Sequence, residues 1–209
     1  MHGLPAKMAH GTAGCFGDCE DVREVERHPW PEVKDCDFTE VYRQIEQFPD
    51  KMVFTGMWGC FFHVVMDYFG MENYFIKMYE CPDVVEAVTE HVVNFYVEAN
   101  EKFLAGLGDR PDVTFFGNDF GTQLDLFISP EMFRRFVMPG FKKFIEVSKK
   151  YNKKVLLHSC GSIYRIIPDL IEAGVDVLNP VQPECMDYAE LFEKYGDRIS
   201  FCGTLGTQT

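Results

Sequence analysis

Short apolar runs that alternate with helical segments are the feature that most constrains the fold of this chain. Several of the runs are almost continuously apolar, as strands covered by other elements on both faces must be. Helical patterns separate successive runs, and this order is typical of βα units whose strands lie parallel in one sheet. Five strands are therefore predicted, at Met52–Met57, Val113–Asp119, Lys154–Cys160, Val175–Val181 and Ile199–Leu205.

Residues that begin and end helices lie between the predicted strands. Pro82 opens a long helix that closes near Gly106, and apolar residues recur along it at three- and four-residue intervals. Ser129 followed by Pro130 predicts the start of another helix, because serine caps an N-terminus well and proline suits the first helical position. Two shorter helices are predicted around Pro168–Ala173 and from Asp187 to Gly196.

The predicted fold is an α/β fold, an incomplete (β/α)8 TIM barrel. A complete barrel needs about 250 residues and eight strands, whereas this chain has 209 residues and five predicted strands, so we expect an incomplete chain. An open doubly wound sheet is the alternative, although the sequence has no Gly-x-Gly-x-x-Gly or Walker phosphate loop. Residues 1–49 are expected to form an irregular segment with one short helix within Asp37–Phe48, and residues 50–209 the partial barrel.

Charge and composition limit the kinds of partner. The formal net charge is −13 and the isoelectric point is about 4.8, which disfavours nucleic acids, anionic membranes and polyanionic substrates. No apolar run reaches the roughly 18 to 20 residues of a membrane span, and no signal-peptide pattern opens the chain. We therefore expect a cytoplasmic protein whose eight cysteines are reduced thiols.

His158 and Cys160 are the strongest candidates for chemistry. They lie two residues apart at the C-terminal end of a predicted strand, so their side chains share a face at the end where parallel α/β enzymes place their sites. Imidazole nitrogen and thiolate are good Zn²⁺ ligands, and a catalytic zinc uses three protein ligands. A hydrogen-bonded histidine beside a buried thiol is the alternative interpretation, because His-x-Cys spacing alone is weakly specific.

Longer motifs favour the metal interpretation. The segment His158-Ser-Cys-Gly161 is followed by Ile166-Ile-Pro-Asp-Leu-Ile-Glu-Ala-Gly174 and then by Val175-Asp-Val-Leu-Asn-Pro-Val-Gln-Pro183. Gly117-Asn-Asp-Phe-Gly-Thr-Gln123 and Ile128-Ser-Pro-Glu-Met132 precede them. Together these segments resemble the uroporphyrinogen decarboxylase superfamily, and within it the cobalamin-linked methyltransferase branch. The resemblance runs from about residue 52 to the end of the chain.

The resemblance implies a (β/α)8 barrel and a zinc ion held by His158, Cys160 and a later cysteine. In that branch the metal activates a thiol, which accepts a methyl group from methylcobalamin carried by a corrinoid protein. The third zinc ligand would lie beyond Thr209. The Arg-rich N-terminal signature of the decarboxylases is absent, which favours the methyltransferase branch.

Further polar residues are expected at the mouth of the barrel. Asn118 and Asp119 end an apolar run, and an acidic group there acts as a general base, orients a substrate or accepts a hydrogen bond from a metal-bound histidine. Gln123, Asn179 and Gln182 lie at comparable ends and are candidates to bind substrate or cofactor. The alternative role for these five side chains is to form hydrogen bonds with nearby backbone groups of their own loops.

Three functions are therefore compared. The first is zinc-dependent methyl transfer from a corrinoid to a small thiol or similar acceptor. The second is uroporphyrinogen decarboxylation, which requires several cationic groups for the substrate carboxylates, and near the mouth the sequence offers few arginines beyond Arg165. The third is a non-catalytic fragment of such a barrel. An unclosed parallel sheet exposes strand edges, so self-association is expected.

Overall fold

The chain forms one parallel sheet whose strands follow one another in chain order. The computed structural model describes residues 14–57, 59–110 and 113–206. All five predicted strands are present, each shorter than predicted, and every neighbouring pair is parallel. Their bounds are β1 (Phe54–Thr55), β2 (Val113–Gly117), β3 (Lys154–His158), β4 (Val177–Asn179) and β5 (Ser200–Phe201).

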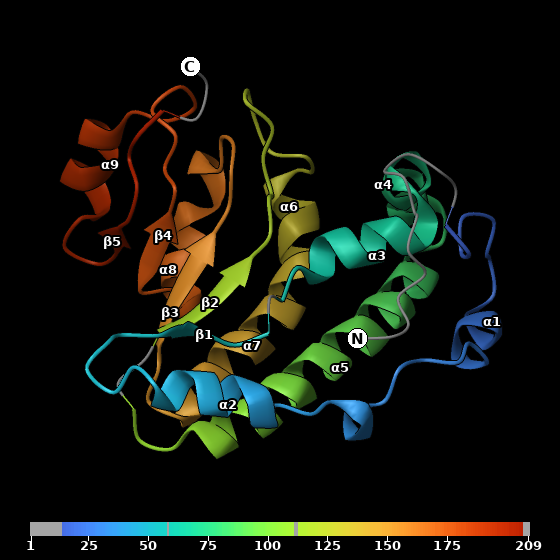
Figure 1. The fold of residues 1–209 in the computed structure, drawn as a ribbon. Helices are drawn as coiled ribbons and strands as arrows, with labels where there is room; N and C mark the ends of the chain where they lie inside the picture. Colours follow the sequence, from blue (N-terminus) through green and yellow to red (C-terminus); the bar gives the residue numbers. More distant parts are fainter. Residues whose placement is uncertain (1–13, 58, 111–112, 207–209) are drawn as a thin grey trace.

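The strand order decides between the two predicted topologies. A doubly wound sheet reverses its strand order at a switch point, whereas the strands of a barrel follow in sequence. The order here is β1-β2-β3-β4-β5 without reversal. The α/β architecture with barrel-type winding is confirmed, and the sheet is not closed within the described residues, as Figure 1 shows.

Helices between successive strands cover one face of the sheet (Figure 1). The side chain of Ser129 caps α6 by accepting a hydrogen bond from the backbone amide of Met132, as its sequence context predicts. The side chain of Asp187 caps α9 by accepting a hydrogen bond from the backbone amide of Glu190. A π-helical turn, Phe133–Val137, joins α6 to α7. The bounds of these helices are α5 (Pro82–Leu107), α6 (Pro130–Met132), α7 (Met138–Lys150), α8 (Ile167–Ala173), preceded by the 3-10 turn Tyr164–Ile166, and α9 (Tyr188–Tyr195).

The segment before α5 contains more helix than the sequence analysis predicted. The predicted helix in Asp37–Phe48 is α2 (Thr39–Glu46), and α1 (Val22–Glu26) and a 3-10 turn (Val33–Asp35) precede it. Two further helices, α3 (Phe61–Phe69) and α4 (Met71–Glu80), lie between β1 and α5 and were not predicted. The boundary of the barrel domain at residue 49 stays a prediction.

The helix-covered face of the sheet carries the main core. Phe116 and Leu157, on neighbouring strands, are almost fully buried there. Thr114 on β2 donates its hydroxyl to the Ser148 hydroxyl of α7 at 2.9 Å or to the Lys154 carbonyl of β3 at 3.0 Å, and the side chains of Thr114 and Ser148 are fully buried. These contacts join β2 to α7 and to β3.

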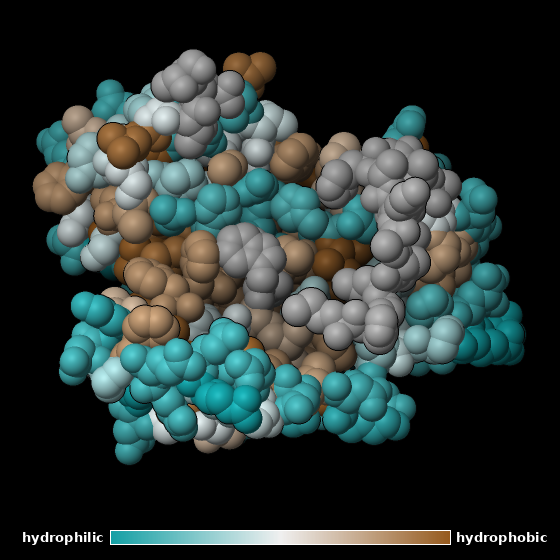
Figure 2. Space-filling view, in the orientation of Figure 1, coloured by the Kyte–Doolittle hydropathy of each residue, from teal (hydrophilic) through white to brown (hydrophobic). Residues whose placement is uncertain are grey.

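The opposite face of the sheet, which lines the interior of a barrel, is partly open. Phe54 on β1 is 55% exposed and packs edge-on against Phe115 of β2. In Figure 2 a hydrophobic band crosses the middle of the molecule in this view. His158 and Asn179, at the ends of β3 and β4, are half-buried. None of the helices in the described ranges has the length and apolar character needed to cross a membrane.

Candidate metal centre

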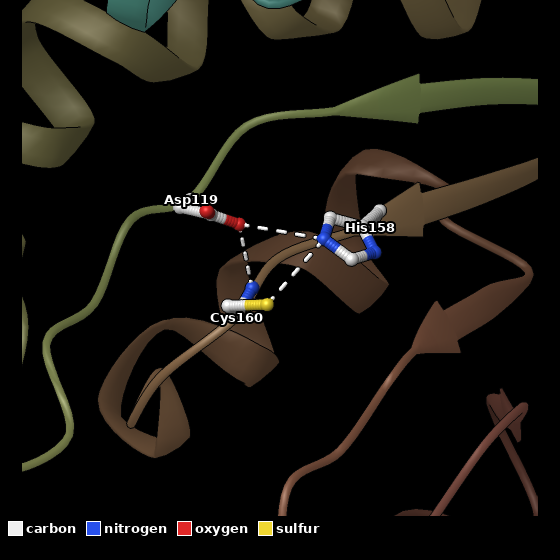
Figure 3. Close-up of side chains that lie close together, drawn as sticks. All are labelled: Asp119, His158 and Cys160. Carbon is white, nitrogen blue, oxygen red and sulfur yellow. Dashed lines mark hydrogen bonds and ion pairs between the residues drawn. The ribbon is translucent and has the colours of Figure 1, made fainter. Parts of the chain in front are cut away.

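Asp119, His158 and Cys160 converge at the C-terminal ends of β2 and β3 (Figure 3). The parallel register pairs Gly117 with His158, so the residues that follow the two strands run side by side. The backbone amide of Cys160 donates to Asp119 Oδ1 at 2.7 Å, which ties the two strand ends together. Three side chains that can bind a cation are thus brought to one point from two strands.

The distances between the three side chains fit a tetrahedral zinc site. Bond lengths of about 2.0 to 2.3 Å place neighbouring ligands of such a site about 3.3 to 3.8 Å apart. His158 Nε2 lies 3.5 Å from Cys160 Sγ and 3.6 Å from Asp119 Oδ1. All three ligand atoms lie within 4.8 Å of one another. Imidazole, thiolate and carboxylate are also the donor set that zinc prefers, so these residues fit the metal.

Asn179 sets the orientation of the His158 ring. Its amide nitrogen donates to the carbonyl of Cys202 at 2.9 Å, which turns its Oδ1 toward His158 Nδ1 at 2.7 Å. Because an amide oxygen only accepts, Nδ1 carries a proton and donates it to Asn179, and Nε2 is the ring nitrogen that faces Asp119 and Cys160. Metal-binding histidines in general donate their other ring N–H to an oxygen in this way.

The thiol of Cys160 is protonated in the absence of a cation. Burial raises its pKa above the ordinary value, and the charges of Asp119 and Cys185 raise it further. A divalent cation between these groups replaces the proton of Cys160 and compensates the charge of Asp119. Metal binding at this point is therefore coupled to proton release.

The backbone around Cys160 depends on a glycine. Gly161 has a φ of +82°, and a Cβ there would lie 2.4 Å from the Gly121 carbonyl oxygen. Only glycine accepts both this conformation and this approach without cost. The segment after β3 thus packs directly against the loop after β2, close to the cluster.

Asn118, predicted as a catalytic residue, is placed beneath the cluster. Its side chain is 1% exposed and is bonded to backbone at both ends: its nitrogen donates to the Gly59 carbonyl at 2.7 Å, and its oxygen accepts from the Phe62 amide at 3.0 Å. In this position it joins the end of β2 to the loop between β1 and α3. Sequence reasoning identified the residue but not these distant partners.

Gln182 and Gln123 lie on the other side of Cys160. Gln182 is 2% exposed and accepts the Gly161 amide at 2.5 Å, so its contact is with the backbone of the motif. Gln123 is exposed, and its Oε1 accepts a hydrogen bond from the Cys185 thiol at 3.1 Å. The sequence analysis did not single out Cys185, because no motif spacing connects it to the other residues.

Comparison with known proteins identifies the family of this chain. Residues 18–209 match the family described as uroporphyrinogen decarboxylase (URO-D). The chain belongs to the uroporphyrinogen decarboxylase family. This finding confirms the resemblance inferred from the motifs between Gly117 and Pro183.

One sequence relative of this uroporphyrinogen decarboxylase-family chain, and one solved structure with a similar fold, are described as methyltransferases. It is 31% identical over 80 residues to the methylcobamide:CoM methyltransferase MtaA of Methanosarcina barkeri, a stretch covering 38% of this chain and 22% of that protein. A solved methyltransferase from Methanosarcina mazei has a TM-score of 0.61 and 21% identity, covering 83% of this chain and 53% of that one. This chain therefore spans about half or less of the length of these relatives.

The family assignment and the structural likeness confirm the barrel-type fold predicted from the sequence. The expectation of a third zinc ligand beyond Thr209 stays a prediction. Asp119 offers a third ligand atom within the described residues. The sequence analysis placed Asp119 near the site but did not give it that role.

Proposed function

We propose that this uroporphyrinogen decarboxylase-family chain carries the zinc site of a methyltransferase, which transfers a methyl group from a methylated corrinoid to a thiol or similar acceptor. The observation that carries the proposal is the convergence of Asp119, His158 and Cys160 at tetrahedral ligand distances. The donor and acceptor classes come from the similarity to MtaA, whose name includes both methylcobamide and CoM.

Zinc bound by these three residues would lower the pKa of an acceptor thiol, so that the nucleophilic thiolate is present at neutral pH. Asp119, His158 and Cys160 would hold the ion, and a fourth tetrahedral position would remain for the acceptor. Asn179 keeps the His158 ring in the ligating tautomer. During transfer, the new sulfur–carbon bond forms as the bond between the methyl group and its donor breaks.

Decarboxylation of uroporphyrinogen is a second candidate, because the family is named for it. That reaction needs several cationic groups that bind the carboxylates of the substrate. Arg165, the arginine that the sequence analysis noted, is paired with Asp125 at 3.2 Å. The geometry of the three-residue cluster favours methyl transfer over this alternative.

Metal analysis of the purified chain tests the proposal directly. We expect about one Zn²⁺ per chain, as a catalytic site with three protein ligands requires. Cys160→Ala should lose the metal and keep the fold, whereas the control Cys36→Ala should keep both. Cys36 is a suitable control because it lies in the N-terminal segment, after the turn Val33–Asp35. Wild-type protein without stoichiometric metal would overturn the proposal.

The activity test uses the protein over the full length of its gene. We expect methylation of a small thiol from methylcobalamin, lost on chelation and in Cys160→Ala. Thiol methylation at the wild-type rate in Cys160→Ala would exclude the mechanism. Turnover of uroporphyrinogen by the metal-free protein would instead move the assignment to decarboxylation.

A further inference from the structure

Ser159 is a buried polar residue between two members of the metal centre, His158 and Cys160. It is 1% exposed, and its hydroxyl oxygen accepts a hydrogen bond from the backbone amide of Phe120 at 3.1 Å. The same hydroxyl donates to the carbonyl of Cys160 at 3.4 Å. Because Phe120 directly follows Asp119, this one hydroxyl contacts the chain beside all three residues of the centre.

The register of β2 and β3 shows what a regular ladder would contain at this place. The last regular bond runs from the Asn118 amide to the His158 carbonyl at 3.0 Å. The bonds of a parallel ladder are evenly spaced, so the next bond would run from the Cys160 amide to the Asn118 carbonyl. The bond after it would run from the Phe120 amide to the Cys160 carbonyl.

Two side chains replace the backbone partners of these bonds. The amide of Cys160 donates instead to Asp119 Oδ1 at 2.7 Å, a contact drawn in Figure 3. The Ser159 hydroxyl stands between the Phe120 amide and the Cys160 carbonyl, at 3.1 and 3.4 Å. Two such bonds in series span more than one direct bond of about 2.9 Å, so the strand ends are held apart. The wider gap leaves room for the Asp119 carboxylate beside the Cys160 amide.

The side chain of Phe120 anchors this contact in the core. It is 1% exposed, and its ring packs edge-on against those of Phe133 and Phe62 at centroid distances of 5.0 and 5.6 Å. Phe120 therefore gives the chain beside Asp119 a fixed point. The Ser159 hydroxyl joins this fixed point to the end of β3.

We propose that Ser159 is a positioning residue of the metal centre, whose hydroxyl holds the ends of β2 and β3 apart so that the Asp119 carboxylate reaches the other two ligands. The inference rests on the function proposed above. Without the hydroxyl, the Phe120 amide can bond directly to the Cys160 carbonyl, as in a regular ladder, and the strand ends close. A carboxylate displaced by this closure no longer completes a site with three protein ligands.

Metal affinity and the visible spectrum of the Co²⁺-loaded chain test this role. Ser159→Ala is expected to weaken Zn²⁺ binding about 10- to 100-fold, the usual effect of losing a group that orients a metal ligand. The visible absorption of bound Co²⁺ should also fall, because a centre that loses a protein ligand to water is less tetrahedral. Ser159→Thr keeps the hydroxyl and should recover both the affinity and the spectrum. Circular dichroism shows whether each variant is folded.

Ser148→Ala is the matched control, because it also removes a fully buried hydroxyl. That hydroxyl is bonded to Thr114, near the start of β2, and to the Phe144 carbonyl of α7. Its loss should leave the Zn²⁺ affinity and the Co²⁺ spectrum unchanged. An equal loss of affinity in Ser148→Ala and Ser159→Ala would overturn the specific role of Ser159.

A double-mutant cycle with Asp119→Ala separates positioning from a general loss of stability. Because Ser159 acts through Asp119, Ser159→Ala should change the affinity of the Asp119→Ala chain by less than about twofold. A full second loss there, or wild-type affinity in Ser159→Ala alone, would overturn the role of Ser159 and leave the proposed function intact. A wild type that binds no Zn²⁺ would overturn both.

Discussion

At the scale of single residues, the hydrogen bond from His158 to Asn179 decides which ring nitrogen faces the metal centre. Asn179 is itself oriented by the carbonyl of Cys202, so the tautomer of His158 is set by a chain of two contacts. Such partners of metal-binding histidines raise the basicity of the ring and hold it in place. The effect of Asn179 on metal binding is therefore indirect and can be measured.

Asn179→Ala is expected to weaken Zn²⁺ binding about 10- to 100-fold, because the ring loses the acceptor that fixes its tautomer. Asn179→Asp should recover much of the affinity, since a carboxylate also accepts from Nδ1. Competition titration with a chromogenic chelator measures both variants. The control is Asn94→Ala, an exposed residue of α5. Equal affinities in Asn179→Ala and wild type would show that Asn179 does not position the histidine.

Metal uptake is expected to release protons in proportion to the thiols that bind. The pKa of Cys160 is raised by burial and then by its neighbours, so the thiol is protonated at neutral pH and must lose its proton to bind. Each such thiol makes the affinity rise about tenfold per pH unit below its pKa. Calorimetry of the wild type in buffers of different ionisation enthalpy should count about one proton released for the Cys160 thiol when Zn²⁺ binds at neutral pH. Zn²⁺ uptake without proton release would contradict coordination by Cys160.

The chemistry of single residues was only partly predictable from the sequence. The two-residue spacing of His158 and Cys160 placed them on one face, and the structure brings them within 3.5 Å. The roles of Asn118 and Gln182 depend on backbone groups 56 and 21 positions away in the chain. No local pattern encodes such pairings, because they arise only when the sheet assembles.

At the scale of elements, two buried asparagines hold the chain between β1 and the first turn of α3. Asn118 binds the backbone of Gly59 and of Phe62 in that first turn, and Asn100 of α5 accepts from the amide of Met57 at 2.9 Å. Asn100 also donates to the Tyr96 carbonyl of its own helix at 2.8 Å. The segment is thus fixed to β2 and to α5 before α3 begins.

Asn118→Ala should destabilise the protein by about 2 to 4 kcal/mol, because it leaves one buried amide and one buried carbonyl without partners. Hydrogen exchange should also quicken at Phe62 more than in α7. Urea unfolding measures the free energy, and Asn94→Ala serves again as the exposed control. A loss below about 0.5 kcal/mol would mean that the segment finds other partners.

Capping signals made several elements predictable, while α3 and α4 were missed for a physical reason. Ser129 occupies its predicted cap position, Asp187 caps the helix that was predicted to start there, and Gly174 ends α8 in a left-handed conformation. In α3 the five buried residues recur at helical spacing, but no side-chain cap marks its start. A mostly apolar stretch of only nine residues without a capping residue or a proline at its start is difficult to distinguish from a strand by sequence alone.

At the scale of the whole molecule, the sheet presents an open face and two strand edges. Within the described residues β1 pairs only with β2, and β5 pairs only with β4. Unpaired strand edges and exposed apolar side chains promote association between chains. Phe54, on β1, combines both features.

The 209-residue chain is expected to self-associate, and Phe54→Lys should reduce this by placing a charge on the open strand. Light scattering measures the mass, and binding of a hydrophobic dye reports the exposed face. Tyr79→Lys is the control, because Tyr79 is 74% exposed on α4, away from the sheet. A monomeric wild type with a single cooperative melt and no dye binding would contradict the expectation.

The register between β2 and β3 also determines which changes of length the gene tolerates. Because side chains alternate between the two faces of a strand, one inserted residue within β3 would turn His158 and Cys160 toward the helices, and one within β2 would displace Asp119. The loop tip at Leu124 is 92% exposed and carries no such constraint. Related proteins that bind the metal are therefore expected to differ in length at this loop tip. Within β2 and β3 their length should be the same, because insertions and deletions there would disrupt metal binding.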